Sequence, residues 1–199
     1  MFPRSLQRHL RKAKMENYHS ESPLREITLR NGDTCHFYRA DIGDSERIIE
    51  YINSVAVESD YLSFGRGEFT MSSEDERRLI SSFKERSNCL MAVAKCDQSI
   101  VGLITMQGGS RKRIYHWAEI ALSVSMKYWG MGIGRVLIEL AVEHAGRNGI
   151  TRIGLKVRTD NDRAIALYRK MGFEIEGKLK KFMRVNDDYF DFYQMGRDV

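Results

Sequence analysis

A dense cluster of glycines at the end of an apolar stretch constrains this chain more than any other feature. Gly130, Gly132 and Gly134 alternate with other residues in YWGMGIGRVLIELAVEHAGRNG, and an apolar pattern with helical spacing follows at once. The helix is predicted to end near Arg147, because the Asn-Gly pair that comes next is a typical helix stop. The glycines therefore form a turn that opens directly into a helix.

The segments on either side of this helix indicate the fold class. IYHWAEIALSVS precedes the glycines, TRIGLKVR follows the helix, and both have the composition of strands. Strand, helix and strand in this order form a βαβ crossover, whose strands run parallel. Further hairpins, helices and strands are predicted at 25–40, 41–57, 72–86, 89–96, 99–109, 160–172, 173–185 and 188–196. We expect an α/β fold: a mixed, mostly antiparallel twisted sheet with a central parallel βαβ crossover and flanking helices.

Turn and cap residues place the predicted boundaries. Asn31-Gly32 is a strong signal for a two-residue hairpin turn. Asp41 or Asp44 is expected to cap the first helix, and Asp160 the last, which Gly172 ends. An irregular loop rich in aromatic and acidic residues separates the first two helices.

Length and composition favour one domain. The 199 residues, 42% of them hydrophobic, predict a domain at 23–199 behind a basic extension at 1–22. No apolar run approaches the length that spans a bilayer, and the start lacks the apolar block of a secretory signal. Cys35, Cys89 and Cys96 have no metal-type spacing, so buried free thiols and no metal are expected. These features favour the reducing cytoplasm.

The charge is compatible with more than one partner. A net charge of +5 and a pI near 9.1 suit an anionic ligand or nucleic acid without choosing between them. The extension carries five basic residues before its first acid, which fits either a helix that binds acidic surfaces or a solvated arm. The solvated arm is favoured, because Leu6 and Leu10 give only a thin apolar stripe.

A glycine turn before a helix is suited to holding an anion. The first helical N–H groups lack internal partners and carry partial positive charge, and glycines let a phosphate approach the backbone. The letters do not match a phosphate-loop NTPase, since no Lys-Ser/Thr follows, nor a Rossmann turn, whose third glycine position falls on Arg135 or Leu137. A turn that merely connects two elements remains an alternative.

A second segment resolves this alternative. TDNDRAIALYRKMGFEIEG follows the next strand, and together with GMGIGRVLIE it resembles the GCN5-related N-acetyltransferase (GNAT) family. The family's Gln/Arg-x-x-Gly-x-Gly/Ala loop binds the pyrophosphate of acetyl-CoA, and the glycine part matches. Trp129 stands where the family has Gln or Arg, which puts a side-chain contact in doubt and resembles the branch of ribosomal-protein alanine and spermidine acetyltransferases. The resemblance covers roughly Arg25 to Arg197 in element order and is specific at 119–177.

The resemblance implies that acetyl-CoA is the cosubstrate. Backbone groups at the end of the strand before the glycines would run beside the pantetheine, and one of their amides would polarise the thioester carbonyl. Arg135 is placed to reach a phosphate, and Arg163 and Arg169 flank the second CoA-binding segment. The implied CoA-binding residues are Leu122, Ser123, Val124, Trp129, Gly130, Met131, Gly132, Ile133, Gly134, Arg135, Val136, Asn161, Arg163, Ala164, Tyr168 and Arg169.

Acetyl transfer to an amine requires a base for the amine proton and a donor for the departing thiolate. The resemblance places Tyr168 beside the sulfur as the donor, although ordinary packing among apolar neighbours is the alternative. Glu119 is the expected base, because an acid inside an apolar strand is costly unless it is paired or faces a polar cavity. A structural salt bridge is the alternative for Glu119. His116 is expected on the opposite face, in a packing or surface role.

The resemblance implies direct attack by a primary amine: a small molecule, a polyamine or a peptide N-terminus. The loop between the first two helices would cover the acceptor side, and its acids and aromatics, among them Glu58, Asp60, Tyr61, Phe64 and Glu68, suit a cationic amine. Tyr189 and Asp191 would lie in the opposite wall. The competing reading is an acyl-CoA-binding sensor without turnover. Nucleic acid is not expected as a partner, since no recognition motif accompanies the basic charge, nor is a membrane. A homodimer is left open.

Overall fold

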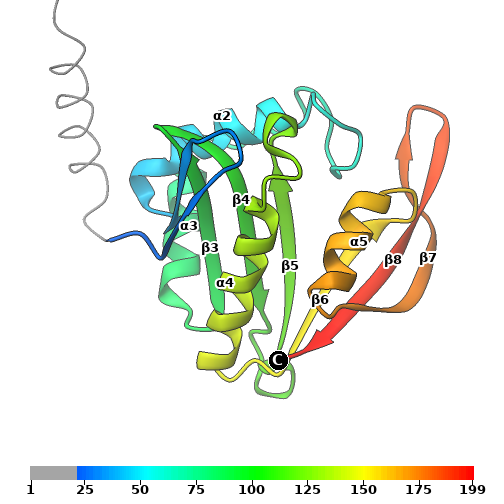
Figure 1. Ribbon diagram of the computed structural model, residues 1–199. Coiled ribbons are helices and arrows are strands. Elements are labelled where there is room, and N and C mark those ends of the chain that lie inside the picture. Colours follow the sequence, from blue (N-terminus) through cyan, green and yellow to red (C-terminus); the bar gives the residue numbers. More distant parts are fainter. Residues whose placement is uncertain (1–21) are drawn as a thin grey trace, which may run out of the picture.

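The computed structural model describes residues 22–199, which form an eight-stranded sheet in the order β1-β2-β3-β4-β5-β6-β8-β7 (Figure 1). β5 and β6 run parallel, and every other neighbouring pair is antiparallel. This confirms the predicted mixed sheet with a central parallel crossover. The strands are β1 (Arg25–Thr28), β2 (Thr34–Arg39), β3 (Cys89–Cys96), β4 (Ser99–Gly108), β5 (Trp117–Val124), β6 (Arg152–Arg158), β7 (Glu174–Val185) and β8 (Asp188–Asp198).

Helices cover both faces of the sheet. α4 and α5 pack on one face, and α2 and α3 pack on the other (Figure 1). Each face has its own apolar core, because the inward residues of the central strands alternate between the two sides. The helices are α2 (Ser45–Val55), α3 (Ser73–Glu85), α4 (Ile133–Arg147) and α5 (Asp162–Lys170), with 3-10 turns η1 (Ile42–Asp44), η2 (Lys112–Ile114) and η3 (Met126–Tyr128).

The two parallel strands pair over only part of their length. The pairing runs from Trp117↔Arg152 to Glu119↔Gly154 and then stops. Beyond that point β5 stays paired with β4 as far as Val124, while β6 stays paired with β8. The sheet therefore opens into a V between β5 and β6, which diverge away from the end that carries the C-terminus (Figure 1). The start of α4 follows β5 at the open end of this V.

Cap residues near the first helices agree with the sequence in part. Asp41 caps η1 by accepting the N–H of Gly43 at 3.1 Å, whereas Asp44 makes no side-chain cap for α2. The Asp44 carboxylate instead lies 2.5 Å from the buried Lys95 amine. α2 ends at Val55, slightly before the predicted boundary.

Asp160 does not cap α5, contrary to the prediction. The cap is Asn161, whose side chain accepts the N–H of Ala164 at 3.2 Å. Asp160 is drawn away by an ion pair with Arg158, with 2.6 Å between the closest atoms. The strand predicted at 114–125 is also shorter: η2 ends at Ile114, a turn follows, and β5 begins only at Trp117. His116 precedes β5, is exposed, and does not belong to either strand face.

Cys35, Cys89 and Cys96 are buried and free, as predicted. Of the helices in residues 22–199, none combines the length and the apolar character needed to cross a membrane. The basic extension predicted at 1–22 lies outside the described residues except for Ser22.

Candidate active site

Two of the three glycines adopt backbone conformations that favour glycine. Gly130 has φ of 76° and Gly132 has φ of 91°, both in the left-handed region. A Cβ added at either position would have no atom within 4 Å, so the backbone faces open space. Gly132 is the N-cap of α4 and provides no side-chain cap. The turn therefore leaves the start of α4 accessible to a ligand.

The first amides of α4 are available to a ligand. The N–H of Val136 bonds the carbonyl of Gly132 at 3.2 Å, whereas those of Ile133, Gly134 and Arg135 donate to no group among the described residues. Such amides, combined with the partial positive charge of the helix start, bind anions. The geometry thus fits a phosphate group of CoA at this turn.

Gly134 has a packing role. A Cβ added there would lie 3.1 Å from Cδ2 of Leu167 in α5 and 3.6 Å from Cδ2 of Leu122 in β5. Its absence lets α4, α5 and the end of β5 approach closely. The third glycine therefore joins the two predicted CoA-binding segments, while its amide remains part of the helix start.

Trp129 holds the entrance of the turn in place of the family's Gln or Arg. Its indole Nε1 donates to the carbonyl of Val124 at 2.7 Å. The guanidinium of Arg163, in the first turn of α5, lies 4.8 Å from the ring centroid. This cation–π contact places Arg163 beside the turn. Arg135 and Arg169 are both exposed.

Tyr168 is buried in α5, with 7% of its surface exposed. Its ring packs edge-on against Phe173, with 5.8 Å between the centroids. Burial raises the pKa of Tyr168 to about 12, so the phenol keeps its proton at neutral pH. No residue in the described part of the chain hydrogen-bonds the Tyr168 hydroxyl. The hydroxyl oxygen is also not one of the fully buried atoms without a partner, so it remains reachable. The hydroxyl is therefore free to donate to a ligand.

Glu119 lies where the pairing between β5 and β6 ends, opposite Gly154. Its carboxylate lies 2.6 Å from the amine of Lys156, and 39% of the Glu119 side chain remains exposed. The structure thus contains the salt bridge that was the alternative for Glu119. The exposed remainder also leaves the carboxylate accessible from the V.

A hydrogen bond between α2 and β5 was not predicted from the sequence. Tyr51 is only 4% exposed, and its hydroxyl donates to Oγ of Ser123 at 3.0 Å. Ser123 lies on the same strand face as Glu119, four residues further along β5. Tyr51 therefore fixes a hydroxyl in the splayed part of the strand. The sequence pattern places Tyr51 among the apolar residues of a helix, so it did not indicate this hydrogen bond.

Several groups of the loop between α2 and α3 already have partners, either in the loop or in other elements. The Glu58 carboxylate accepts the N–H of Met126 at 2.6 Å, and that of Glu68 accepts the N–H of Gly65 at 2.7 Å. The ring of Tyr61 contacts Arg158, 4.7 Å from the centroid to the guanidinium carbon. Fewer of these groups are open to a cationic acceptor than the sequence suggests.

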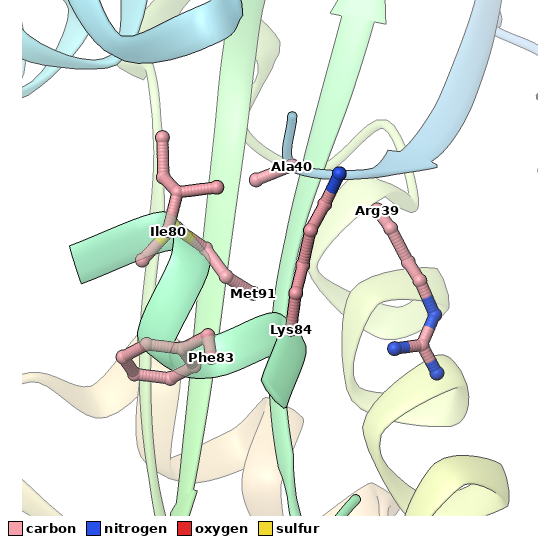
Figure 2. A pocket seen from close by; sticks show the side chains of 6 residues that line it. All are labelled: Arg39, Ala40, Ile80, Phe83, Lys84 and Met91. Atoms are coloured by element: carbon pink, nitrogen blue, oxygen red, sulfur yellow. The ribbon is translucent and has the colours of Figure 1, made fainter. Parts of the chain in front are cut away.

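A small pocket lies away from the glycine turn, between α3 and strands β2 and β3 (Figure 2). The side chains that line it are Arg39, Ala40, Ile80, Phe83, Lys84 and Met91. The amine of Lys84 is engaged by Asp41 at 2.6 Å. None of the residues predicted to bind CoA lines this pocket.

Comparison with known proteins agrees with this geometry. The model of the acetyltransferase (GNAT) family matches residues 55–173, which include the splayed strands, the glycine turn and Tyr168. The chain belongs to the GNAT family of acetyltransferases. Members of this family use acetyl-CoA, and the open amides of α4 are suited to its phosphates.

Several curated GNAT relatives resemble part of the chain. It is 34% identical to the L-amino acid N-acetyltransferase AaaT of Escherichia coli over 57% of this chain and 70% of that protein. It is 35% identical to the N-alpha-acetyltransferase RimI of Mycobacterium tuberculosis over 53% and 63%. It is 28% identical to the spermidine N(1)-acetyltransferase of Escherichia coli over 52% of this chain and 55% of that protein. The match thus spans less than two thirds of the latter two. These similarities support an N-acetyltransferase.

Two solved structures resemble most of this chain. An acetyltransferase of the GNAT family from Streptococcus pneumoniae superposes with a TM-score of 0.81 at 27% identity, covering 83% of this chain and 99% of that one. The protein yncA of Salmonella typhimurium, solved with its cofactor acetyl-CoA, superposes with a TM-score of 0.73 at 16% identity, covering 82% of this chain and 93% of that one. The second similarity concerns the fold alone.

Proposed function

We propose that this GNAT protein transfers the acetyl group of acetyl-CoA by direct attack of a primary amine. The observation that carries the proposal is a set of amides at the start of α4 that have no partner within residues 22–199, next to a turn where those residues leave open space above Gly130 and Gly132. In the proposal these amides bind the pyrophosphate. The end of β5, from Leu122 to Val124, lies beside the pantetheine.

Glu119 and Tyr168 have the proposed acid–base roles. The neutral amine forms a bond to the thioester carbon, and the C–S bond breaks as the tetrahedral species collapses. The amine proton passes to the Glu119 carboxylate, directly or through water, and then to solvent. The electron pair of the broken bond stays on sulfur, beside the Tyr168 hydroxyl. All three cysteines are buried in the sheet, which supports transfer without an acetyl-cysteine.

The acidity of Tyr168 refines its role. Its pKa of about 12 lies well above the value of an ordinary thiol, which is about 8.5. Complete proton transfer from this phenol to a thiolate is therefore uphill. We assign Tyr168 as a hydrogen-bond donor that stabilises the charge developing on sulfur, and solvent then supplies the proton.

For the acceptor we favour a single α-amine over a polyamine. The three relatives act, by their names, on L-amino acids, on an α-amine and on spermidine. A polyamine carries several cations, whereas Glu58 and Glu68 already accept backbone N–H groups. The α-amine of an amino acid or a peptide needs fewer free carboxylates.

A turnover screen tests the function. Thiol release from acetyl-CoA is measured with L-amino acids, with peptides of varied N-terminal residue, with spermidine and with amine antibiotics. We expect turnover with an α-amine, and the acetylated product is identified by mass spectrometry. If the protein binds CoA in calorimetry but turns over none of these amines, the result supports an acyl-CoA sensor instead.

A further inference from the structure

Arg158, the last residue of β6, is a buried arginine whose guanidinium contacts several elements. It is 7% exposed, and its Nε and Nη2 donate to the two carboxylate oxygens of Asp160 at 2.8 and 2.6 Å. Its Nη1 donates to the backbone carbonyl of Asp60, in the loop between α2 and α3, at 2.9 Å. One guanidinium therefore joins the end of β6 to a loop that is about a hundred residues earlier in the sequence.

Two aromatic rings contact the same guanidinium. Its carbon lies 4.7 Å from the ring centroid of Tyr61 and 3.7 Å from that of Phe190 in β8. Cation–π contacts of this kind strengthen where water is excluded. Arg158 thus contacts both the α2–α3 loop and the β7–β8 hairpin.

The same loop is also attached to the other arm of the V. The Glu58 carboxylate accepts the N–H of Met126, which comes shortly after the end of β5. Residues 58–61 therefore run from the end of β5 to the end of β6, where the two strands no longer pair. In Figure 1 the loop between α2 and α3 lies at this open end.

We propose that Arg158 is a positioning residue that fastens residues 58–61 and Phe190 as the acceptor-side wall of the active site. The inference rests on the proposed function, because the wall has this role only if an amine enters the V. An arginine is required: its planar fork serves Asp160 and Asp60 together while its faces contact the rings. Lysine keeps the charge but not this geometry. The rings of Tyr61 and Phe190 consequently already contact a cation of the protein, the Arg158 guanidinium.

The test uses full-length Arg158→Lys and Arg158→Gln, with Arg152→Lys and Arg152→Gln as matched controls. Arg152 lies on the same strand and is also ion-paired, to Asp198 at 2.8 Å, but at the end far from the open V. Hydrogen exchange of residues 58–61 is measured by mass spectrometry, and CoA affinity by calorimetry. KM and kcat are measured with acetyl-CoA and, separately, with L-amino acids and an alanine-starting peptide.

The Arg158 variants are expected to accelerate exchange in 58–61 and to raise KM for the amine by about tenfold or more, which the loss of one charge-assisted hydrogen bond explains. In the Arg158 variants, CoA affinity should stay within about twofold of the wild type. The Arg152 variants should change neither the exchange in 58–61 nor the KM for the amine. If the Arg158 variants do not fold, Tyr61→Leu keeps the ion pair, removes one ring, and should shift exchange and KM in the same direction.

Unchanged exchange and unchanged amine KM in folded Arg158→Gln would overturn the proposal. An equal loss of CoA affinity would also overturn it, because the loop would then serve the donor side. Failure of the proposed function has a different signature: the wild type would turn over none of the amines. Exchange in 58–61 would still report whether Arg158 holds the loop.

Discussion

The amine of Lys156 lies 2.6 Å from the carboxylate of Glu119, across the point at which β5 and β6 stop pairing. The pair joins the two strands where their backbone hydrogen bonds end. Both side chains are partly exposed, 30% for Lys156 and 39% for Glu119. Ion pairs this accessible to water contribute about 0–1 kcal/mol. A purely structural role for Glu119 would therefore be a small one.

Glu119→Gln separates the two roles of this residue. If Glu119 takes the amine proton, kcat should fall by roughly 10²- to 10⁴-fold at neutral pH. The rate should recover partly at high pH, where more of the amine is neutral. A pH–rate profile, measured alongside thermal unfolding, checks this expectation.

Lys156→Gln is the matched control, since it removes the same ion pair and keeps the carboxylate. We expect it to retain most of the rate. If Glu119→Gln and Lys156→Gln lower the melting temperature alike and leave the rate per folded molecule intact, Glu119 is a structural partner and not the base.

Gly132→Asp tests the anion site at the start of α4. It places a carboxylate beside amides that are free to bind phosphate, so CoA affinity should fall by about 100-fold or more. Gly149→Asp is the control: Gly149 has φ of 73°, and an added Cβ there likewise meets nothing within 4 Å. Both variants carry a similar backbone strain of about 1–2 kcal/mol. Calorimetry that finds equal CoA affinity in the two folded variants would refute the site.

Tyr168→Phe removes one hydroxyl and leaves the edge-on contact with Phe173. We expect kcat to fall by roughly 10²-fold or more, with little change in CoA affinity. Because the pKa of Tyr168 is about 12, the alkaline limb of the wild-type profile below pH 10 should not come from this residue. Steady-state rates over pH 6–10 test both points. Wild-type rates in the folded variant would eliminate Tyr168 as the donor to sulfur.

His144 should make stability depend on pH. Burial, and next the charge of Arg39, lower its pKa, and Nη2 of Arg39 lies 2.8 Å from Nδ1 of His144. The folded pKa is thus below that of the unfolded chain, which is about 6.5. Above that pH both states are neutral at this position and the stability is complete. As the pH falls, the unfolded chain takes up the proton first, and the free energy of unfolding decreases.

His144→Gln cannot titrate, and so it should show a smaller loss of stability between pH 7 and pH 5. Urea unfolding of both proteins across this range measures the difference. Parallel curves for the wild type and the variant would show that His144 does not link protonation to folding.

Local signals predicted most of the elements. Gly172, with φ of 80°, follows the end of α5, and the glycine turn precedes α4, because each signal depends on a few neighbouring residues. The hairpin predicted at Asn31-Gly32 also forms, but its loop spans residues 30–32 and not two residues. The N–H of Leu29 donates to the carbonyl of Asp33 at 2.8 Å, and within the loop only Gly32 has positive φ.

The cap of α5 was misassigned because two good cap residues are adjacent in the sequence. Asp160 pairs with Arg158, only two residues earlier, and Asn161 caps the helix.

The sequence by itself determined the order of strands and helices, the parallel crossover and a helix start able to bind an anion, since periodicity and turn chemistry are local properties of the chain. Only the tertiary structure decided how polar side chains are used: that Glu119 meets Lys156, Tyr51 meets Ser123, and Arg158 meets Asp60. Each of these contacts joins residues 37 to 98 positions apart. These three contacts lie around the region where β5 and β6 no longer pair, and no local pattern specifies which partner each residue meets.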